Sequence, residues 1–136
     1  MVTIHADRKV LNWFRRQALS AHPNEYIASL WCVSNTDSIS VVDIRPIDHE
    51  ADNDSVYFDT EDGSFGAADG KLVRVGTIHS HPDCTDCSPS EFDWDSTAAR
   101  KELITGICQI WKTPSGRRRT KIRFYNARAA CPLTIK

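Results

Sequence analysis

The sequence predicts an α/β or α+β fold in which a single mixed β-sheet is flanked by helices. A helical apolar pattern opens the chain, apolar or β-branched runs of strand length follow, and a second helical segment separates two of those runs. Helices and strands therefore mix without strict alternation. A length of 136 residues suits one compact domain, which we expect to span residues 1–136.

The first predicted helix follows Asp7, whose side chain can cap it. Four apolar residues then share one helical face: Val10, Leu11, Phe14 and Ala18. We expect this helix to end before His22-Pro23, because the residue before a proline resists the α conformation.

Two strands are expected next, over residues 26–33 and 38–44. The first is largely apolar, the second is rich in β-branched residues, and the intervening segment 34–37 has the composition of a turn. The pair therefore predicts a β-hairpin. The polar and acidic segment 48–70 is expected to form a long loop or short edge strands.

The second half of the chain predicts the rest of the sheet. Alternation over residues 72–78 indicates a strand, and a helix is expected over about 89–101. An apolar strand over 103–111 and a turn at 113–116 then precede a last strand over 121–125, which should pair back on its predecessor.

Composition excludes several classes of protein. With 40% hydrophobic and 26% charged residues and a net charge of −1, the chain is neither disordered nor a general nucleic-acid binder. No apolar run is long enough to span a membrane, and no signal peptide is evident. Five cysteines, an odd number, indicate mostly reduced thiols, with Cys32 and Cys108 in the core. We therefore expect a cytoplasmic protein with no membrane or nucleic-acid partner, and the oligomeric state stays open.

Charge is segregated along the chain. Residues 112–136 include eight basic residues and no acidic one, whereas residues 43–69 are rich in acids. One interpretation is a solvated hairpin that faces an acidic loop. The other is a docking surface, because complementary fields steer protein encounters. The run Arg117–Arg119 is too short to indicate nucleic acid.

His79 and His81 carry the first chemical signal. Residues two apart in a strand point to the same side, so these imidazoles would lie together at a strand end. Two imidazoles and one carboxylate form a recurrent ligand set of catalytic zinc, which keeps a fourth position open for water.

The start of the second helix offers the carboxylate. Ser88 as N-cap, Pro89 at the first helical position and Glu91 in a capping box account for three residues. Ser90 and Asp93 then share one helical face that could meet the histidine strand. A rival assignment makes Ser90 the cap with Asp93 as its reciprocal partner, which would give this pair a structural role.

Hydrolysis at a metal also needs a general base. Glu25, which opens the first apolar strand, is the candidate, although an exposed charge beside a strand is the simpler interpretation.

The motifs His79-x-His81-Pro82, Pro89-Ser90-x-x-Asp93 and Pro23-x-Glu25 resemble the signature of the JAMM (MPN-plus, JAB) metalloprotease family, over about residues 5–125. The resemblance implies the MPN/JAMM, cytidine-deaminase-like architecture. It implies Zn²⁺ bound by His79, His81 and Asp93. Glu25 would be the general base and then the acid to the leaving amine, and Ser90 would donate a hydrogen bond to the oxyanion.

The short connection after Asp93 leaves no room for the insertion that helps eukaryotic deubiquitinating relatives hold ubiquitin, so the chain resembles compact prokaryotic or phage-type members. The implied activity is a metallopeptidase or isopeptidase acting on a protein or peptide substrate, such as the tail of a ubiquitin-like or sulfur-carrier protein. Zinc rests on the resemblance, since such ligands also hold iron or manganese.

Other interpretations stay open. Cys84 and Cys87 could brace their loop as thiols or a disulfide, could form a redox or accessory metal site, or could be accidental. The alternative function is a non-catalytic scaffold of the same fold that docks a partner through the basic hairpin at 117–123. A zinc deaminase fits poorly, because His81 stands where that signature has glutamate.

Overall fold

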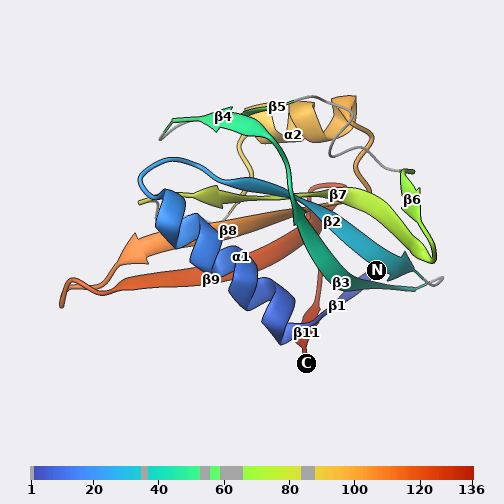
Figure 1. Cartoon of the computed structure of the whole chain (residues 1–136), viewed down its shortest axis with the longest axis horizontal. Coiled ribbons are helices and arrows are strands. Elements are labelled where there is room, and N and C mark those ends of the chain that lie inside the picture. Colours follow the sequence, from blue (N-terminus) through green and yellow to red (C-terminus); the bar gives the residue numbers. More distant parts are fainter. Residues whose placement is uncertain (1, 35–36, 53–55, 59–65, 84–87) are drawn as a thin grey trace.

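A computed structural model describes residues 2–34, 37–52, 56–58, 66–83 and 88–136 (Figure 1). The elements in chain order are β1 (Thr3–Ala6), α1 (Arg8–Ala21), β2 (Ile27–Ser34), β3 (Ser38–Pro46), β4 (His49–Ala51), β5 (Val56–Phe58), β6 (Ala68–Asp69), β7 (Leu72–His81), α2 (Glu91–Ala99), β8 (Ile104–Lys112), β9 (Arg118–Asn126), β10 (Ala129–Ala130) and β11 (Leu133–Ile135). No helix in these ranges is long and apolar enough to cross a bilayer.

One mixed sheet organises the molecule. Nine of the described strands belong to it, in the order β10-β9-β8-β7-β2-β3-β1-β11, with β6 paired to β7. β7 and β8 run parallel and are joined through α2, and β1 runs parallel to both β3 and β11. The predicted mixed sheet with flanking helices is confirmed, and β4 and β5 add a separate two-stranded sheet.

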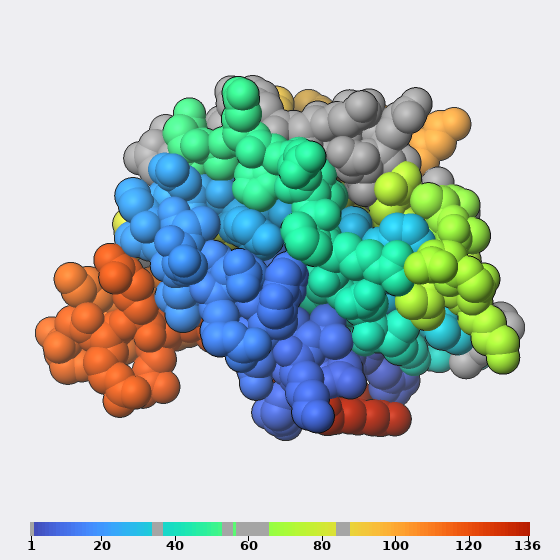
Figure 2. Space-filling view, viewed as in Figure 1, coloured from blue at the N-terminus to red at the C-terminus, as the bar shows by residue number. Residues whose placement is uncertain are grey.

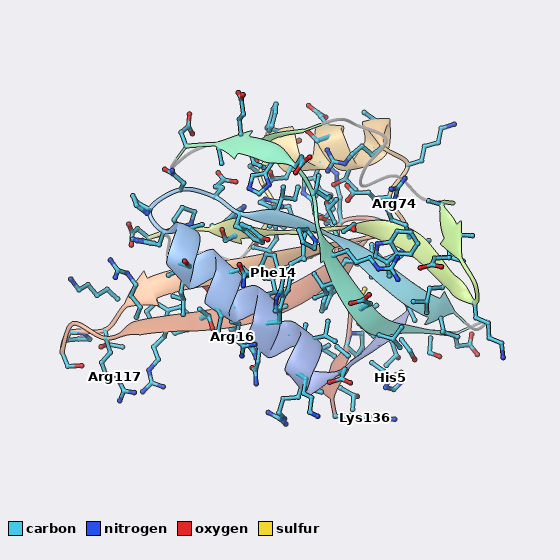
Figure 3. All side chains as sticks on the ribbon, viewed as in Figure 1. His5, Phe14, Arg16, Arg74, Arg117 and Lys136 are labelled. Atoms are coloured by element: carbon cyan, nitrogen blue, oxygen red, sulfur yellow. The ribbon has the colours of Figure 1, made fainter. Side chains whose placement is uncertain are left out.

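The α1 face of the sheet holds the main apolar core. The Asp7 carboxylate accepts the backbone N–H of Lys9 at 2.8 Å and caps α1, as predicted. The helix buries Leu11, Phe14 and Ala18, and Phe14 lies between helix and sheet (Figure 3). Alternate residues of the central strands pack against them, among them Ala28, Leu30, Ile78, Cys108, Ile110 and Phe124.

Strand register places the intervening residues on the opposite, α2 face. Ile27 pairs with His79, His79 with Ile107, and Ile107 with Arg123, so these residues form one row across four strands. The next row contains His81, Gln109 and Lys121. The sheet therefore carries its histidines on the face away from the main core.

Several predicted boundaries differ from the structure. The helix expected over 89–101 begins at Glu91 and ends at Ala99. Segment 48–70 forms the short strands β4, β5 and β6 where it is described, and the expected turn at 34–37 lies partly outside the described residues. The terminal strands β1, β10 and β11 were not expected from the sequence. They are two to four residues long, too short to show periodicity.

Candidate metal centre

The two histidines project from the end of β7. Their Nε2 atoms lie 3.1 Å apart, and the ring centroids are separated by 4.9 Å. The His79 side chain is 6% exposed and that of His81 is 18% exposed. The predicted juxtaposition is confirmed, with one buried imidazole and one at the rim.

Asp93 reaches both histidines from the first turn of α2. One carboxylate oxygen, Oδ1, lies 3.3 Å from the Nε2 of His79, and the other, Oδ2, lies 3.2 Å from the Nε2 of His81. Two elements joined through a loop thus bring together the three donor groups that the family resemblance implied.

The N-cap of α2 is Ser90, so the expectation that Ser88 caps this helix is wrong. Ser90 Oγ accepts the backbone N–H of Asp93 at 3.1 Å, and Asp93 Oδ2 accepts the backbone N–H of Ser90 at 2.8 Å. Glu91, the partner expected for Ser88, instead pairs with Arg128 at 3.1 Å. Asp93 therefore both caps the helix and faces the histidines, two roles that the sequence presented as alternatives.

The donor set fits a zinc ion. With zinc bonds of about 2.0–2.2 Å, neighbouring ligands of a tetrahedral site lie about 3.3–3.6 Å apart. The two imidazole Nε2 atoms lie 3.1 Å apart, and each lies 3.2–3.3 Å from a different oxygen of the Asp93 carboxylate. One ligand atom from each of the three residues lies within 4.8 Å of the other two. Within the described residues this is the group of side chains able to hold a metal. The same donors also accept other divalent metals.

Electrostatics favour the metal-binding forms of His79 and Asp93. Burial lowers the pKa of His79 and outweighs the Asp93 carboxylate, which raises it, so a neutral imidazole is favoured. Burial opposes ionisation of Asp93, but hydrogen bonds with His79, His81 and the Ser90 backbone hold the pKa of Asp93 well below its usual range. Neutral imidazole and ionised carboxylate are the states that bind metal.

Glu25 comes two residues before the start of β2, the strand that pairs with the histidine strand. Glu25 is 7% exposed, and its backbone N–H donates to the carbonyl of Asp52 at 2.8 Å. Ile27 pairs with His79, and the backbone N–H of Ser80 donates to Tyr26 at 2.9 Å. Continuing this antiparallel register places Glu25 across from His81. Burial at this position contradicts the simpler interpretation of an exposed charge.

The Ser90 hydroxyl is exposed beside the triad. Its oxygen accepts from Asp93, and no acceptor for its hydrogen occurs among the described residues. The hydroxyl can therefore still donate to an incoming group.

A buried polar network that the sequence pattern does not indicate includes Thr77, two residues before His79 on β7. Glu102 accepts a hydrogen bond from the hydroxyl of Thr77 and pairs with Arg100 at 2.7 Å. Sequence offers little signal for it, because charged residues after a helix are usually exposed.

The basic hairpin projects from one end of the molecule (Figure 2), with Arg117 near its tip (Figure 3). β6, from the acidic segment, lies at the opposite end (Figure 1). Two of the described acids of the acidic segment 43–69, Asp43 and Asp69, pair with Arg45 on β3. Cys84 and Cys87 lie outside the described residues, whereas Cys32, Cys108 and Cys131 are free thiols.

Comparisons with known proteins bear on the family and on the fold. Residues 7–124 match the family of prokaryotic homologs of the JAB domain. The fold is similar to a JAB1/MPN domain protein from Archaeoglobus fulgidus, with a TM-score of 0.60, 22% identity and 98% of each chain covered. It is also similar to a protein from Desulfitobacterium hafniense, with a TM-score of 0.56, 16% identity, and 98% of this chain and 93% of that chain covered. No curated protein sequence matches the chain significantly.

Proposed function

The chain belongs to the family of prokaryotic homologs of the JAB domain, and from this premise we propose that it is a zinc-dependent metallopeptidase or isopeptidase. Its substrate is an amide bond at the exposed tail of a ubiquitin-like or sulfur-carrier-like protein. The observation that carries the proposal is the convergence of His79, His81 and Asp93 as a group able to hold a metal ion. The burial of Glu25, which precedes the strand paired with the histidine strand, supports it.

Each residue has a role that follows from its position. A zinc ion held by the triad supplies a Lewis acid that acidifies water and polarises a carbonyl oxygen. The Glu25 carboxylate takes a proton from the attacking water as the water oxygen bonds to the carbonyl carbon. It then gives that proton to the amine that leaves when the C–N bond breaks. The Ser90 hydroxyl donates to the oxyanion, and such a donor is worth about 2.7–4 kcal/mol in the transition state.

The basic side chains of β9 offer a docking surface for the substrate protein. Arg123 and Lys121 stand in the same rows as His79 and His81, two strands away, or about 10 Å across the sheet. Both are exposed and have no ion-pair partner among the described residues. Free thiols among the described cysteines support a reducing, cytoplasmic environment.

Elemental analysis tests the metal site. Wild-type protein purified without added metal should contain about one zinc per chain, and His79→Ala should contain none. Absence of metal in the wild type, or metal retained by His79→Ala, would contradict the proposed site.

Hydrolysis tests the mechanism. The substrates are a ubiquitin-like protein and a sulfur-carrier protein, each with a fluorescent amine on its C-terminal carbonyl. Glu25→Gln should keep its zinc and lose turnover. Ser90→Ala should lower kcat about 10²–10³-fold, whereas Ser90→Thr, which keeps both cap and hydroxyl, should retain activity. A wild-type rate in Glu25→Gln would refute the assigned base.

The exposed hairpin favours one second candidate, a scaffold that docks a protein without turnover. Partner binding lost in Arg119→Ala/Lys121→Ala/Arg123→Ala, with no peptidase activity in the wild type, would favour it. Arg118→Ala is the matched control, because strand alternation places Arg118 on the other face of β9.

A further inference from the structure

Helix α2 holds the carboxylate of the metal centre, yet it has little apolar attachment to the sheet. None of its nine residues is buried, and Phe92 is 62% exposed. Its aromatic contact is an edge-on packing of Trp94 against Tyr125, with the ring centroids 5.9 Å apart. By contrast, α1 buries three apolar side chains in the core. Trp94 packs on Ile107 and Tyr125, and polar contacts at the two ends of α2 add to this one apolar attachment.

The end of α2 is fixed by buried polar groups. Arg100, the C-cap residue, contacts Glu102 through Nη2 and Oε2 at 2.7 Å, and the two side chains are 9% and 0% exposed. The other oxygen of Glu102 accepts from the hydroxyl of Thr77 on β7. Thr77 is fully buried. We call these three residues the Thr77–Glu102–Arg100 clamp.

The clamp and the metal centre bind opposite ends of α2 to the same strand. Thr77 and His79 lie two residues apart on β7 and therefore share a face. Asp93 and Arg100 are separated by about 10 Å along the helix, and Thr77 and His81 by about 13 Å along the strand. The helix thus lies along β7 in the antiparallel sense, attached at its start through Asp93 and at its end through Glu102.

A buried ion pair is a poor explanation of stability by itself. Removing two charges from water is so unfavourable that apolar replacements often stabilise a protein. Burial indeed raises the pKa of Glu102, although Arg100 and the Thr77 hydroxyl oppose that shift. A buried pair such as Arg100 and Glu102 has a clearer role where it fixes the orientation of nearby metal ligands.

We infer that the Thr77–Glu102–Arg100 clamp positions Asp93 against His79 and His81, so that Glu102 and Thr77 are positioning residues that set the affinity of the site for a divalent metal. This inference rests on the metal binding in the proposed function, but it concerns residues that touch neither metal nor substrate.

Zinc affinity measured by competition with a chromophoric chelator at pH 7 and 25 °C tests the clamp. Glu102→Gln keeps the shape of the side chain and removes its charge, and it should weaken zinc binding about 10- to 100-fold. Glu91→Gln is the matched control. It makes the same change in a glutamate of α2 that is also paired with an arginine. In this pair, however, the side chains of Glu91 and Arg128 are 79% and 57% exposed. Glu91→Gln should therefore leave the zinc affinity unchanged.

A second pair of variants keeps the test decisive if Glu102→Gln fails to fold. Thr77→Val removes the hydroxyl at nearly constant volume and should weaken zinc binding, whereas Thr77→Ser should restore wild-type affinity. Wild-type zinc affinity in folded Glu102→Gln or in Thr77→Val overturns the inference alone. Absence of zinc binding by the wild type overturns the proposed function and the inference with it.

Discussion

Zinc should stabilise the folded chain by an amount that depends on His81. At a free zinc concentration of 100 times Kd, binding to the native state adds about 2.7 kcal/mol to the free energy of unfolding. A chain of 136 residues has an unfolding entropy of about 0.29 kcal/mol/K, so this corresponds to a rise in Tm of about 9 °C.

His81→Ala is the informative perturbation. The His81 side chain lies at the rim of the site, 18% exposed, whereas that of His79 is 6% exposed, so truncating His81 disturbs the packing less. If the lost ligand weakens Kd a hundredfold, the same zinc concentration adds only about 0.4 kcal/mol, or about 1.5 °C. Zinc bound by cysteines of the unfolded chain would reduce both shifts.

Thermal unfolding followed by circular dichroism, with zinc and with a chelator, measures these shifts. His5→Ala serves as the control, because it removes a half-buried histidine of β1 outside the triad. It should keep the wild-type response. A wild-type Tm that zinc does not raise, or equal shifts in His81→Ala and His5→Ala, would refute the reasoning.

Three further predictions concern the fold. Gly76→Ala should destabilise the protein by about 3 kcal/mol in urea unfolding, because the new Cβ would lie 1.9 Å from the carbonyl oxygen of Ile104 and would force β7 and β8 apart. Asp7→Ala should reduce the free energy of unfolding by about 1 kcal/mol in the same assay, through loss of the α1 cap. Burial raises the pKa of Cys32 to about 12, so iodoacetamide at pH 8 should leave Cys32 unmodified in native protein and alkylate it after unfolding, as mass spectrometry would show.

Local pattern was enough to predict α1 and the β2–β3 hairpin. Asp7 and the apolar face of α1 lie within a few residues of one another, and the two hairpin strands are adjacent in sequence. β1 is different. It is four residues long, and its partners β3 and β11 lie more than 30 residues away, so its assignment depends on contacts that no window of sequence contains.

The sequence predicted those parts of the candidate site whose residues lie within one helix or one strand. The spacing of His79 and His81 on a strand set their common side, and the structure brings Asp93 to them. The start of α2 was mistaken because Ser88 and Pro89 give a good local signal, while the ion pair of Glu91 with Arg128 depends on tertiary structure. Arg100 and Glu102 were overlooked for the same reason, since only packing shows that they are buried.

The dual role of Asp93 has a consequence for how such a site can be lost in evolution. An asparagine at this position can still accept the backbone N–H of Ser90, so Asp93→Asn removes a charged ligand while α2 keeps its first turn. Replacing His79 would instead leave a gap beneath the site, because that side chain is almost fully enclosed. Descendants that abandon metal chemistry but retain the fold should therefore change the aspartate before the buried histidine.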